Sequence, residues 1–242
     1  IVYLRDTLGA DARFVFCWDG PDNLRKSMHP DYKANRKTED PEVQEARAEL
    51  YRQIELLHAK YLPALGYHNN FRATGYEADD LIASIAKAIL LGNAFHGADP
   101  DCATIVSTDK DLFQLLHPHV NIYNPATKRI YALQDYHREW NLTPGDWPHV
   151  KAIAGCPTDN VAGLRGVGDK TAAAYVRGDL NKGAKFKTIV AAAGQAVWRD
   201  NLKLVKLPLA GCPKFELKDD DVTAAKWRAL EQRLRFRDLG YR

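Results

Sequence analysis

The chain has 242 residues, of which 45% are hydrophobic and 27% charged, as is ordinary for a globular protein. This length suffices for one large domain or two small ones with a sizeable core. The composition excludes collagen-like, low-complexity and wholly disordered chains, and apolar runs that are broken within about a dozen residues exclude a bilayer-spanning segment. The net charge of +3 is too small to prove a polyanionic partner.

The first residues and the cysteines give two further expectations. Residues 1–9 carry apolar side chains at positions 1, 4 and 8, as a helix entered in its middle would, so we expect an N-terminal stretch to precede Ile1. No Cys-x-x-Cys pair is present, which argues against a zinc ribbon or a disulfide scaffold and fits a reducing compartment. The cysteines are Cys17, Cys102, Cys156 and Cys212.

Apolar periodicity predicts the first elements of the chain. They are a helix at 1–9, a buried strand at 13–18, and two longer helices at 41–66 and 77–92. The strand, RFVFCW, is rich in β-formers and closes on a turn that begins at Asp19. Pro41 favours a helix start, and Gly66 and Gly92 favour helix ends.

The later elements are mainly helical. We predict a strand at 103–107, a helix at 111–116, a hairpin around Asn124 and Pro125, helical segments through 135–155, two small helices around a Gly-x-Gly turn within 163–178, and a mostly helical tail at 184–242 with an extended stretch at 206–215. Strands alternate with helices in the first half and helices dominate the second. This order predicts an α/β domain with a helical extension packed on it.

Both predicted strands end in aspartate. Asp19 follows FVFCW, and Asp109 and Asp111 follow TIVST. Because functional groups in an open parallel sheet collect at the carboxyl ends of the strands, we expect these carboxylates at one rim. For any one of them alone, a role in a turn or a helix start is the better interpretation.

Three more carboxylates, Glu77, Asp79 and Asp80, stand at the start of the second long helix. Successive residues turn by about 100°, so these side chains fan over less than half of the helix circumference and repel one another. Capping and the helix dipole account for one or two of them, and a bound cation would remove the remaining conflict. We therefore favour a site for Mg²⁺ or Mn²⁺, which prefer oxygen ligands, over a solvated acidic face.

A basic segment at 25–37, RKSMHPDYKANRK, contains a single tyrosine. Its basic residues are Arg25, Lys26, Lys33, Arg36 and Lys37, and Tyr32 lies among them. Such a patch can track phosphates while the tyrosine ring stacks on a base. The alternative is a solvated charged surface. The predicted acidic site favours the nucleic-acid interpretation, because metal-dependent phosphodiester hydrolysis needs a polyanion held against carboxylates.

The sequence GLRGVGDKTA at 163–172 predicts a tight turn with exposed backbone N–H groups. Gly166 and Gly168 leave no side chain in the way, and Lys170 adds positive charge. We therefore favour phosphate binding over a plain connection between two helices. The spacing of a Walker loop, GxxxxGK[ST], is not met.

Taken in order, FCWDG, DYKANRK, GYEADDLI, VSTDKDLFQLL and TDNVAGLRGVGDKTA resemble the motifs of the 5′-nuclease family, the flap endonucleases and 5′–3′ exonucleases, especially its bacterial and bacteriophage members. The resemblance covers residues 1–175 with distinctive motifs and the rest more loosely. It implies a mostly parallel sheet flanked by helices, a helical arch near 22–66 and a helix–three-turn–helix element that grips duplex DNA. The nuclease core would occupy residues 1–150 and the helical region residues 151–242.

The resemblance also implies roles for single residues. Two divalent ions, Mg²⁺ or Mn²⁺, are expected: Asp19, Glu77, Asp79 and Asp80 match the first metal cluster, and Asp109, Asp111 and Asp159 match the second. Lys33 matches the arch lysine at the scissile phosphate, and Arg25 and Arg36 match basic positions that line the arch. The duplex-gripping hairpin, where K⁺ is also expected, is matched by Gly166, Gly168 and Lys170. We predict Lys33 and Arg36 as catalytic, and Arg25, Tyr32, Lys37 and the hairpin as DNA-binding.

Two departures from the family pattern bear on catalysis. The family has an aspartate in an N-terminal Asp-Gly segment on its first strand, and this chain begins after that point. It usually has an acid at the position of Cys156. Because a thiol is a poor ligand for Mg²⁺, we expect a weakened second site that favours Mn²⁺.

The sequence thus predicts a structure-specific 5′-nuclease that hydrolyses phosphodiester bonds at 5′ ends or flaps of DNA by a two-metal-ion mechanism. The expected partners are DNA with 5′ single-strand/duplex junctions and a polymerase, in cis or in trans, and no membrane. The expected location is the cytoplasm of a bacterium or a phage-infected cell. One alternative is a family member that binds branched DNA with weakened or lost catalysis. Another is a phosphatase for small phosphate esters, which would give the arch and the hairpin no role.

Overall fold

The computed structural model describes residues 1–9, 12–92 and 103–235, so Cys102 lies outside the described residues. By its contacts the chain divides into two compact units. Unit 1 comprises Ile1–Trp18, Thr38–Arg72 and Glu216–Arg242, and unit 2 comprises Asp19–Lys37 and Ala73–Phe215. All the predicted site residues belong to unit 2.

Unit 1 consists of helices and a parallel pair of strands. Its elements are α1 (Val2–Leu8), β1 (Phe16–Trp18), α3 (Pro41–Leu56), α4 (Leu62–Leu65), β2 (Asn70–Arg72) and α11 (Ala224–Leu234). Strand β1 pairs with β2, with Cys17 opposite Phe71. The buried residues of its core are Leu62, Leu65, Tyr67 and Trp227.

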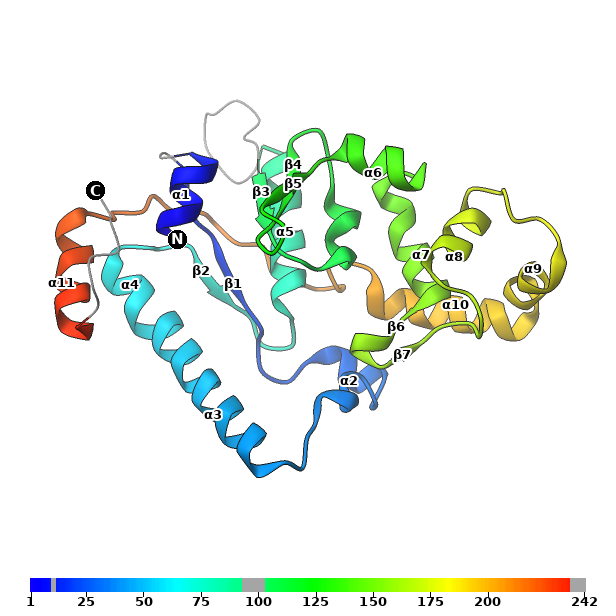
Figure 1. The fold of residues 1–242 in the computed structure, drawn as a ribbon, viewed down its shortest axis with the longest axis horizontal. Helices are drawn as coiled ribbons and strands as arrows, with labels where there is room; N and C mark the ends of the chain where they lie inside the picture. Colours follow the sequence, from blue (N-terminus) through cyan, green and yellow to red (C-terminus); the bar gives the residue numbers. More distant parts are fainter. Residues whose placement is uncertain (10–11, 93–102, 236–242) are drawn as a thin grey trace. The chain divides into compact units, whose positions relative to one another are not determined.

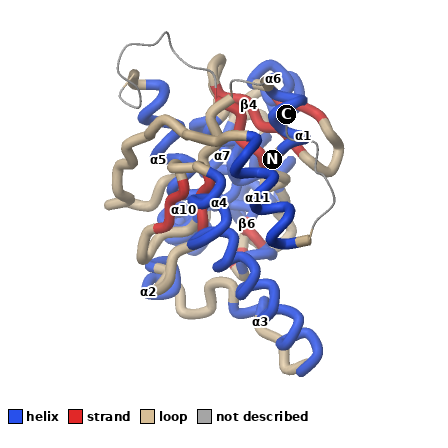
Figure 2. Tube along the Cα trace, turned by 90° about the vertical axis from the view of Figure 1, so that its left-hand side faces the viewer, coloured by secondary structure: helices blue, strands red, loops and turns tan. Residues whose placement is uncertain are grey.

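The helix predicted at 41–66 is present, with one irregular stretch. The Asp40 side chain accepts hydrogen bonds from the backbone N–H groups of Glu42 and Val43, which satisfies two donors at the start of α3. A π-helical stretch, Leu57–Tyr61, leads directly into α4, and Figures 1 and 2 show the two helices following one another. Gly66 ends α4 at a φ of 94°, in the left-handed region that favours glycine.

Unit 2 holds the remaining helices and strands. The helices are α2 (Leu24–Met28), α5 (Ala78–Leu90), α6 (Leu133–Trp140), α7 (Trp147–Ala154), α8 (Asp169–Val176), α9 (Gly183–Val190) and α10 (Ala192–Val205). The strands are β3 (Ala103–Val106), β4 (Val120–Asn124), β5 (Arg129–Tyr131), β6 (Gly155–Cys156) and β7 (Val161–Ala162). Short 3₁₀ turns lie at Ala34–Arg36, Lys110–Leu115, Pro144–Asp146 and Pro157–Asp159.

The α/β class is confirmed, but the described strands form small separate sheets. Strand β3 pairs in parallel with β4, with Ile105 opposite Ile122. Strands β4 and β5 form the antiparallel hairpin predicted around Asn124 and Pro125. Strands β1 and β3 therefore do not share a sheet, because each short strand pairs with the strand that follows it in the chain.

One apolar core of unit 2 continues past residue 150. It contains Ile105 and Val120 from the sheet, Val150 and Ile153 from α7, and Ile189 from α9. Figure 1 shows α7 beside α8 and α10, in agreement with their packing contacts. The division into units therefore differs from the boundary expected at residue 150, because the later helices bury their apolar faces in the same core.

Two predicted helices differ in the structure. The segment expected to be helical at 111–116 is the 3₁₀ turn Lys110–Leu115. The segment 163–178 holds one helix, α8, preceded by a turn and β7. A Cβ on Gly163 would collide with the backbone of Ala154, so the chain passes close to α7 there instead of forming a helix of its own. Among the described helices, none has both the length and the apolar character needed to cross a membrane.

Candidate active site

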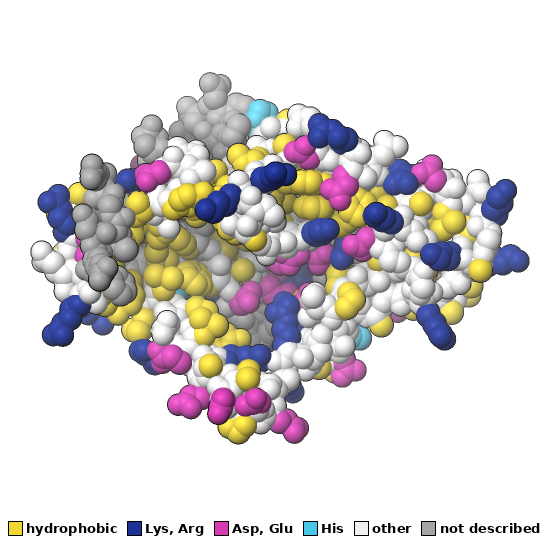
Figure 3. All heavy atoms as spheres, in the orientation of Figure 1, with side chains coloured by type: hydrophobic (Ala, Val, Ile, Leu, Met, Phe, Trp, Pro, Cys, Tyr) yellow, Lys and Arg dark blue, Asp and Glu magenta, His cyan; other side chains and the backbone are white. Residues whose placement is uncertain are grey.

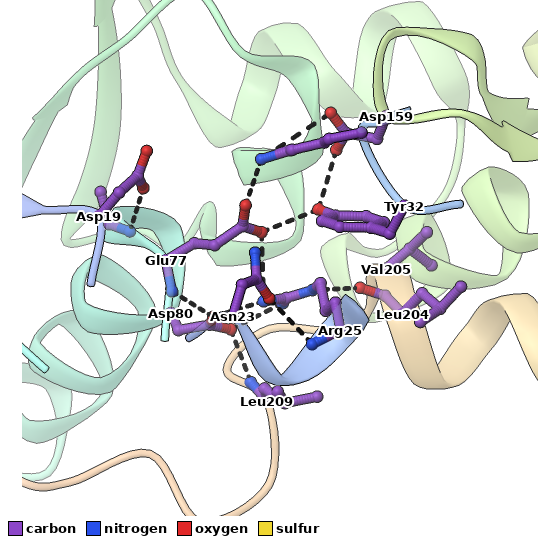
Figure 4. Close-up of polar contacts among 12 residues, drawn as sticks. Asp19, Asn23, Arg25, Tyr32, Glu77, Asp80, Asp159, Leu204, Val205 and Leu209 are labelled. Carbon is purple, nitrogen blue, oxygen red and sulfur yellow. Dashed lines mark hydrogen bonds and ion pairs between the residues drawn. The ribbon is translucent and has the colours of Figure 1, made fainter. Parts of the chain in front are cut away.

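Three aspartates from separate segments of unit 2 form what we call the first carboxylate group. Asp19 directly follows Trp18, the last residue of β1, and Asp79 lies in the first turn of α5. Asp109 lies three residues after Val106, the last residue of β3. Asp19 accepts a hydrogen bond through Oδ1 from the backbone N–H of Ala78 at 2.9 Å, which ties it to the start of α5 (Figure 4). The charges of Asp19 and Asp109 both act on Asp79. The fold thus brings Asp19 and Asp109, which lie far apart in the sequence, close enough for their charges to act on Asp79.

Asp79 is the member of this group that most needs a counterion. It has no hydrogen bond or ion pair within the described residues. Burial raises the pKa of its carboxyl to about 7, with the charges of Asp109, Glu77 and Asp19 adding to the effect and that of Lys33 opposing it. A nearby cation would stabilise the ionised form, so the geometry favours a bound positive charge at this point.

Glu77, just before α5, is held by side chains of the basic segment. Its Oε1 forms an ion pair with Lys33 Nζ, and its Oε2 accepts a hydrogen bond from the hydroxyl of Tyr32 at 2.8 Å (Figure 4). Arg25 Nη1 lies 3.3 Å from the same Oε2. Glu77 therefore anchors Lys33 beside the first carboxylate group.

Arg25 and Asp80 form a buried ion pair below Glu77, with two hydrogen bonds of 2.6 and 2.8 Å between guanidinium and carboxylate. Asp80 also accepts from the backbone N–H groups of Glu77 and Leu209, and Arg25 Nε donates to the carbonyl of Leu204 (Figure 4). Their side chains are 2% and 0% exposed. This corrects two assignments: Asp80 is committed to Arg25 instead of a metal, and Arg25 does not face DNA, because a buried charge must stay paired.

Tyr32 is likewise buried, with 4% of its surface exposed. Its ring packs in an apolar cluster with Cys156, Val161, Leu204 and Val205. Its hydroxyl lies 2.8 Å from Glu77 Oε2 and 3.2 Å from Asp159 Oδ2. Burial, together with these two charges, raises the pKa of the hydroxyl, which therefore stays protonated as a donor. The predicted role of Tyr32 as a stacking platform is thus wrong, because its ring faces protein atoms.

The segment around Lys33 is fixed to the turn that carries Asp159. Lys33 N donates to the carbonyl of Asp159 at 2.8 Å, and Asn160 Nδ2 donates to the carbonyl of Asp31 at 2.8 Å. Lys33 itself has a φ of 56°, in the left-handed region that is costly for residues other than glycine. Strain of this kind persists only where neighbouring contacts impose it, as it often does at functional sites.

The two predicted catalytic cations both lie near Asp159, and Lys33 is also paired with Glu77. Lys33 pairs with Glu77 and lies 3.9 Å from Asp159 Oδ1. Arg36 Nη2 lies 2.6 Å from the same Oδ1, and about half of its side chain is exposed. Lys37, predicted to bind DNA, is exposed directly after this turn.

Asp111 and Asp159 form what we call the second carboxylate group, and the thiol of Cys156 lies beside Asp111. Cys156 Sγ donates to Asp111 Oδ2 at 3.4 Å. Burial raises the pKa of the Asp111 carboxyl, while the charge of Lys151 and the thiol hydrogen bond oppose this shift. Burial also raises the pKa of the Cys156 thiol, and the charge of Asp111 adds to that shift. Cys156 therefore lies beside an acid of the second carboxylate group.

Lys151 is a site residue that the sequence analysis missed. Its Nζ lies 3.5 Å from Asp111 Oδ1 and 3.7 Å from Asp169 Oδ1. Burial alone would lower the pKa of this ammonium. The negative charges of Asp111 and Asp169 raise it by more than burial lowers it, so the pKa is raised overall and the group stays protonated. A single lysine on α7 gives no sequence signal, because only the fold shows which face of the helix meets Asp111.

The predicted hairpin is open to solvent. Gly166 has a φ of 76°, and a Cβ on Gly166 or Gly168 would meet no atom within 4 Å. Gly168 precedes α8 without a side-chain cap, so the first N–H groups of this helix lack a side-chain acceptor. Lys170 is exposed in the same turn of the helix.

Further basic residues surround this hairpin. Lys185 Nζ lies 3.4 Å from the hydroxyl of Thr171, which links α9 to the first turn of α8. The face in Figure 3 shows several Lys and Arg side chains on the part of unit 2 that carries α8 and α9. The sequence signal that could have found them is the absence of any acid at 180–199, where the basic residues are Lys182, Lys185, Lys187 and Arg199.

The two carboxylate groups differ in how well they fit a divalent cation. Within the described ranges, no three His, Cys, Asp or Glu side chains are arranged as a ready-made metal site. The first group offers only oxygen atoms, which Mg²⁺ and Mn²⁺ prefer, and Asp79 there lacks any partner in the described chain. The acids of the second group are already contacted by donors of the chain itself, so by donor chemistry the first group suits a hard cation better than the second.

Comparison with known proteins agrees with this geometry. A family model described as "5′-3′ exonuclease, N-terminal resolvase-like domain" matches residues 3–141. A 5′-3′ exonuclease of Bacillus subtilis is 33% identical over 168 residues, which are 67% of this chain and 51% of that protein. A DNA polymerase I of Rhizobium leguminosarum is 36% identical over 160 residues, which are 65% of this chain and 14% of that protein. The chain thus spans about half, or much less, of the length of these relatives.

A solved structure is similar over most of the fold. It is a bacteriophage T5 D15 flap endonuclease variant in a pseudo-enzyme-product complex with DNA and metal ions. The TM-score is 0.66 at 26% identity, and the match covers 86% of this chain and 78% of that one. Since the family model covers more than half of the sequence, the chain belongs to the 5′–3′ exonuclease family, whose N-terminal resolvase-like domain it contains.

Proposed function

We propose that this chain is a structure-specific nuclease that hydrolyses phosphodiester bonds at 5′ ends or flaps of DNA, with Mg²⁺ or Mn²⁺ as cofactor. The observation that carries the proposal is that the charges of Asp19 and Asp109 act on Asp79, which has no hydrogen bond or ion pair within the described chain. The relative from B. subtilis is named as a 5′-3′ exonuclease, and the T5 protein was crystallised with DNA and metal ions.

Asp19, Asp79 and Asp109 are the residues that would hold the cation. When bound there, a divalent ion lowers the pKa of a coordinated water and polarises a phosphoryl oxygen. The Asp109 side chain is oriented by a local hydrogen bond, since its Oδ1 accepts from the backbone N–H of Asp111 at 2.8 Å. Asp19 is fixed on α5 by the Ala78 N–H. The chain thus positions two of the three oxygen donors before any cation arrives, which lowers the cost of ordering them.

Lys33 and Arg36 supply positive charge at the scissile phosphate. Glu77 holds the Lys33 ammonium beside the first carboxylate group, so the charge is in place without reorganisation. Arg36 is half-exposed, so its guanidinium can leave Asp159 and bind phosphate oxygens instead. Its planar group suits the paired hydrogen bonds that a phosphate accepts. Together they stabilise the negative charge that develops on the phosphate.

The duplex would bind at the open hairpin of Gly166, Gly168 and Lys170, with the exposed lysines of α9 nearby. Backbone N–H groups and lysines contact phosphates, so recognition would be of shape rather than base sequence. K⁺ at this hairpin, a polymerase in cis or in trans, and a cytoplasmic location belong to the same proposal. The polymerase is supported by the longer relative named DNA polymerase I.

A labelled 5′-flap substrate tests the proposed function, with Mg²⁺ or Mn²⁺ and with the variant Asp79→Asn. We expect cleavage by the wild type in either metal and a loss of about 10³-fold in rate in the variant, because one oxygen donor and its charge are removed. The matched control is Asp179→Asn, the same change at an exposed residue that pairs with Arg177. It should cleave like the wild type.

Other outcomes of this assay distinguish the alternatives. Equal cleavage by Asp79→Asn would contradict the proposed site. Flap binding without cleavage in any metal would favour a branched-DNA-binding member that has lost catalysis. Turnover of a generic phosphate ester in preference to DNA would favour a phosphatase.

A further inference from the structure

The second carboxylate group differs from the first because each of its oxygens already faces a donor of this chain. Asp111 Oδ1 lies 3.5 Å from the ammonium of Lys151, and Oδ2 accepts the thiol of Cys156 at 3.4 Å. Asp159 Oδ1 accepts from Arg36 Nη2 at 2.6 Å, and Oδ2 lies 3.2 Å from the hydroxyl of Tyr32. Neither carboxylate is left without a partner.

The donors around these two acids are built into the fold. Lys151 comes from α7, is only 13% exposed, and is also held by Asp169 at 3.7 Å. Tyr32 and Cys156 are both buried in one apolar cluster. Arg36 is fixed from the other side, since its turn is fastened to Pro157 through Asn35 Nδ2 at 2.8 Å. Lys151, Tyr32 and Cys156 are thus held by packing around the two acids, whereas the Arg36 side chain is about half exposed and is held by its contact with Asp159.

Cations of this chain already face both acids of the group, and Lys151 is shared between Asp111 and Asp169. One ammonium, that of Lys151, faces Asp111, and one guanidinium, that of Arg36, faces Asp159. Cys156 adds a neutral donor where an acid would have added a negative ligand. Hard divalent ions require several oxygen donors with net negative charge, and a thiol is a poor ligand for them. The donor set therefore does not fit a second Mg²⁺.

We propose that Lys151 and Arg36 take the place of a second divalent ion, so that this nuclease works with one ion, bound at Asp19, Asp79 and Asp109. The inference rests on the proposed function for the identity of that first site. Lys151 is a positioning residue here: it holds Asp111 and supplies fixed positive charge at the edge of the site. An ammonium gives this charge at any metal concentration, whereas a weak second ion would have to be recruited.

The test counts ions bound to the protein without DNA, by electron paramagnetic resonance of free Mn²⁺ during titration. We expect one Mn²⁺ per chain in the wild type and two in the double variant Cys156→Asp/Lys151→Leu, which restores an acid and removes the competing ammonium. Lys203→Leu is the matched control, since Lys203 is an exposed lysine paired with Asp200 on α10. It should bind one ion, like the wild type.

A second variant keeps the test decisive if the double variant does not fold. Cys156→Asp alone retains Lys151 and should bind the second Mn²⁺ about tenfold more weakly than the double variant, or not at all below millimolar concentration, because the ammonium still competes. Co²⁺ is the probe for a thiophilic ion. The wild type should show no sulfur-to-cobalt charge-transfer band, which a Cys156 ligand would produce.

Three results would overturn the inference: two Mn²⁺ per wild-type chain, a cobalt–thiolate band that is lost in Cys156→Ser, or a second Mn²⁺ as tight in Cys156→Asp as in the double variant. No bound ion in the wild type is a different result, since it would overturn the proposed function at its first site. The count therefore separates the failure of one proposal from the failure of the other.

Discussion

At the scale of single residues, the buried pair of Arg25 and Asp80 fixes the base of the site. Arg25 joins α2 to Asp80 in the first turn of α5 and to the end of α10 through the carbonyl of Leu204. Asp80 in turn orients the backbone of Glu77, which holds Lys33. The position of Lys33, the proposed catalytic cation, thus depends on the buried ion pair of Arg25 and Asp80.

The variant Arg25→Met should therefore act on stability. It leaves the Asp80 carboxylate buried without its cation, which costs about 3–5 kcal/mol in the free energy of unfolding. Urea denaturation measures this loss, and Arg25→Met/Asp80→Leu should recover most of it, because no unpaired charge remains. Lys26→Met, at the exposed neighbouring residue, is the control. A loss in Arg25→Met no greater than in this control would show that the pair is dispensable.

A pH dependence follows from Asp79, whose folded-state pKa of about 7 lies above its ordinary value of 3.8. Between these pH values the folded protein keeps a proton that the unfolded chain has released, so stability falls as pH rises through this window. In EDTA, the free energy of unfolding should drop by at most about 1.4 kcal/mol per pH unit from this group. Asp79→Asn should remove that slope and Asp179→Asn should keep it. The same slope in both variants would assign the effect to another group.

Sequence spacing identified the acids but not the environment of the basic segment. Three acids in the four residues of EADD exceed what helix capping requires, and that excess is visible without a structure. Arg25 and Tyr32 look like surface residues in a basic run, yet their partners Asp80 and Glu77 lie 55 and 45 residues away. Burial of this kind depends on tertiary packing, which no local pattern encodes.

At the scale of elements, the start of α8 carries the proposed contact with duplex DNA. Its first turn has no side-chain cap and Lys170 is exposed there. An uncapped helix start offers N–H donors and the positive end of the helix dipole to a phosphate. The hairpin and this helix would therefore act as one phosphate-binding element.

The variant Lys170→Ala should weaken duplex binding alike for all sequences, because a phosphate contact carries no base information. The slope of log affinity against log salt concentration should become shallower by about 1, as one counterion fewer is released. Fluorescence anisotropy in Ca²⁺ at several salt concentrations measures both. The exposed Lys214, changed to Ala, serves as control. An unchanged slope in Lys170→Ala would place the duplex elsewhere.

Periodicity predicted the long elements better than the short ones. The helices α3 with α4, and α5, were predicted almost to their ends, because Pro41, Gly66 and Gly92 mark them. The hairpin of β4 and β5 was predicted correctly, but the expectation that β1 and β3 share one sheet was wrong, since strands of three or four residues carry too little pattern to name their partners. No helix forms before Gly166. Instead, the backbone at Gly163 passes close to the backbone of Ala154, which is possible because glycine has no Cβ, and the apolar periodicity of the sequence does not reveal this contact.

At the scale of the whole molecule, the site belongs to one unit although its residues span much of the chain. Asp19 and Asp159 are 140 positions apart, and both lie in unit 2. One apolar core of unit 2 contains residues of β3, α7, α8 and α9, so the helices after residue 150 share a core with the strand that precedes Asp109. The proposed catalytic and duplex-binding residues therefore belong to one compact unit.

We propose that Asp19, Asp79 and Asp109 hold one divalent ion between them. Crystals of the protein soaked in Mn²⁺, with diffraction data collected at the manganese absorption edge, would locate that ion. We expect an anomalous peak among the three carboxylates that disappears in Asp79→Asn and persists in Asp179→Asn. No peak there, or one that survives the loss of the Asp79 charge, would contradict it.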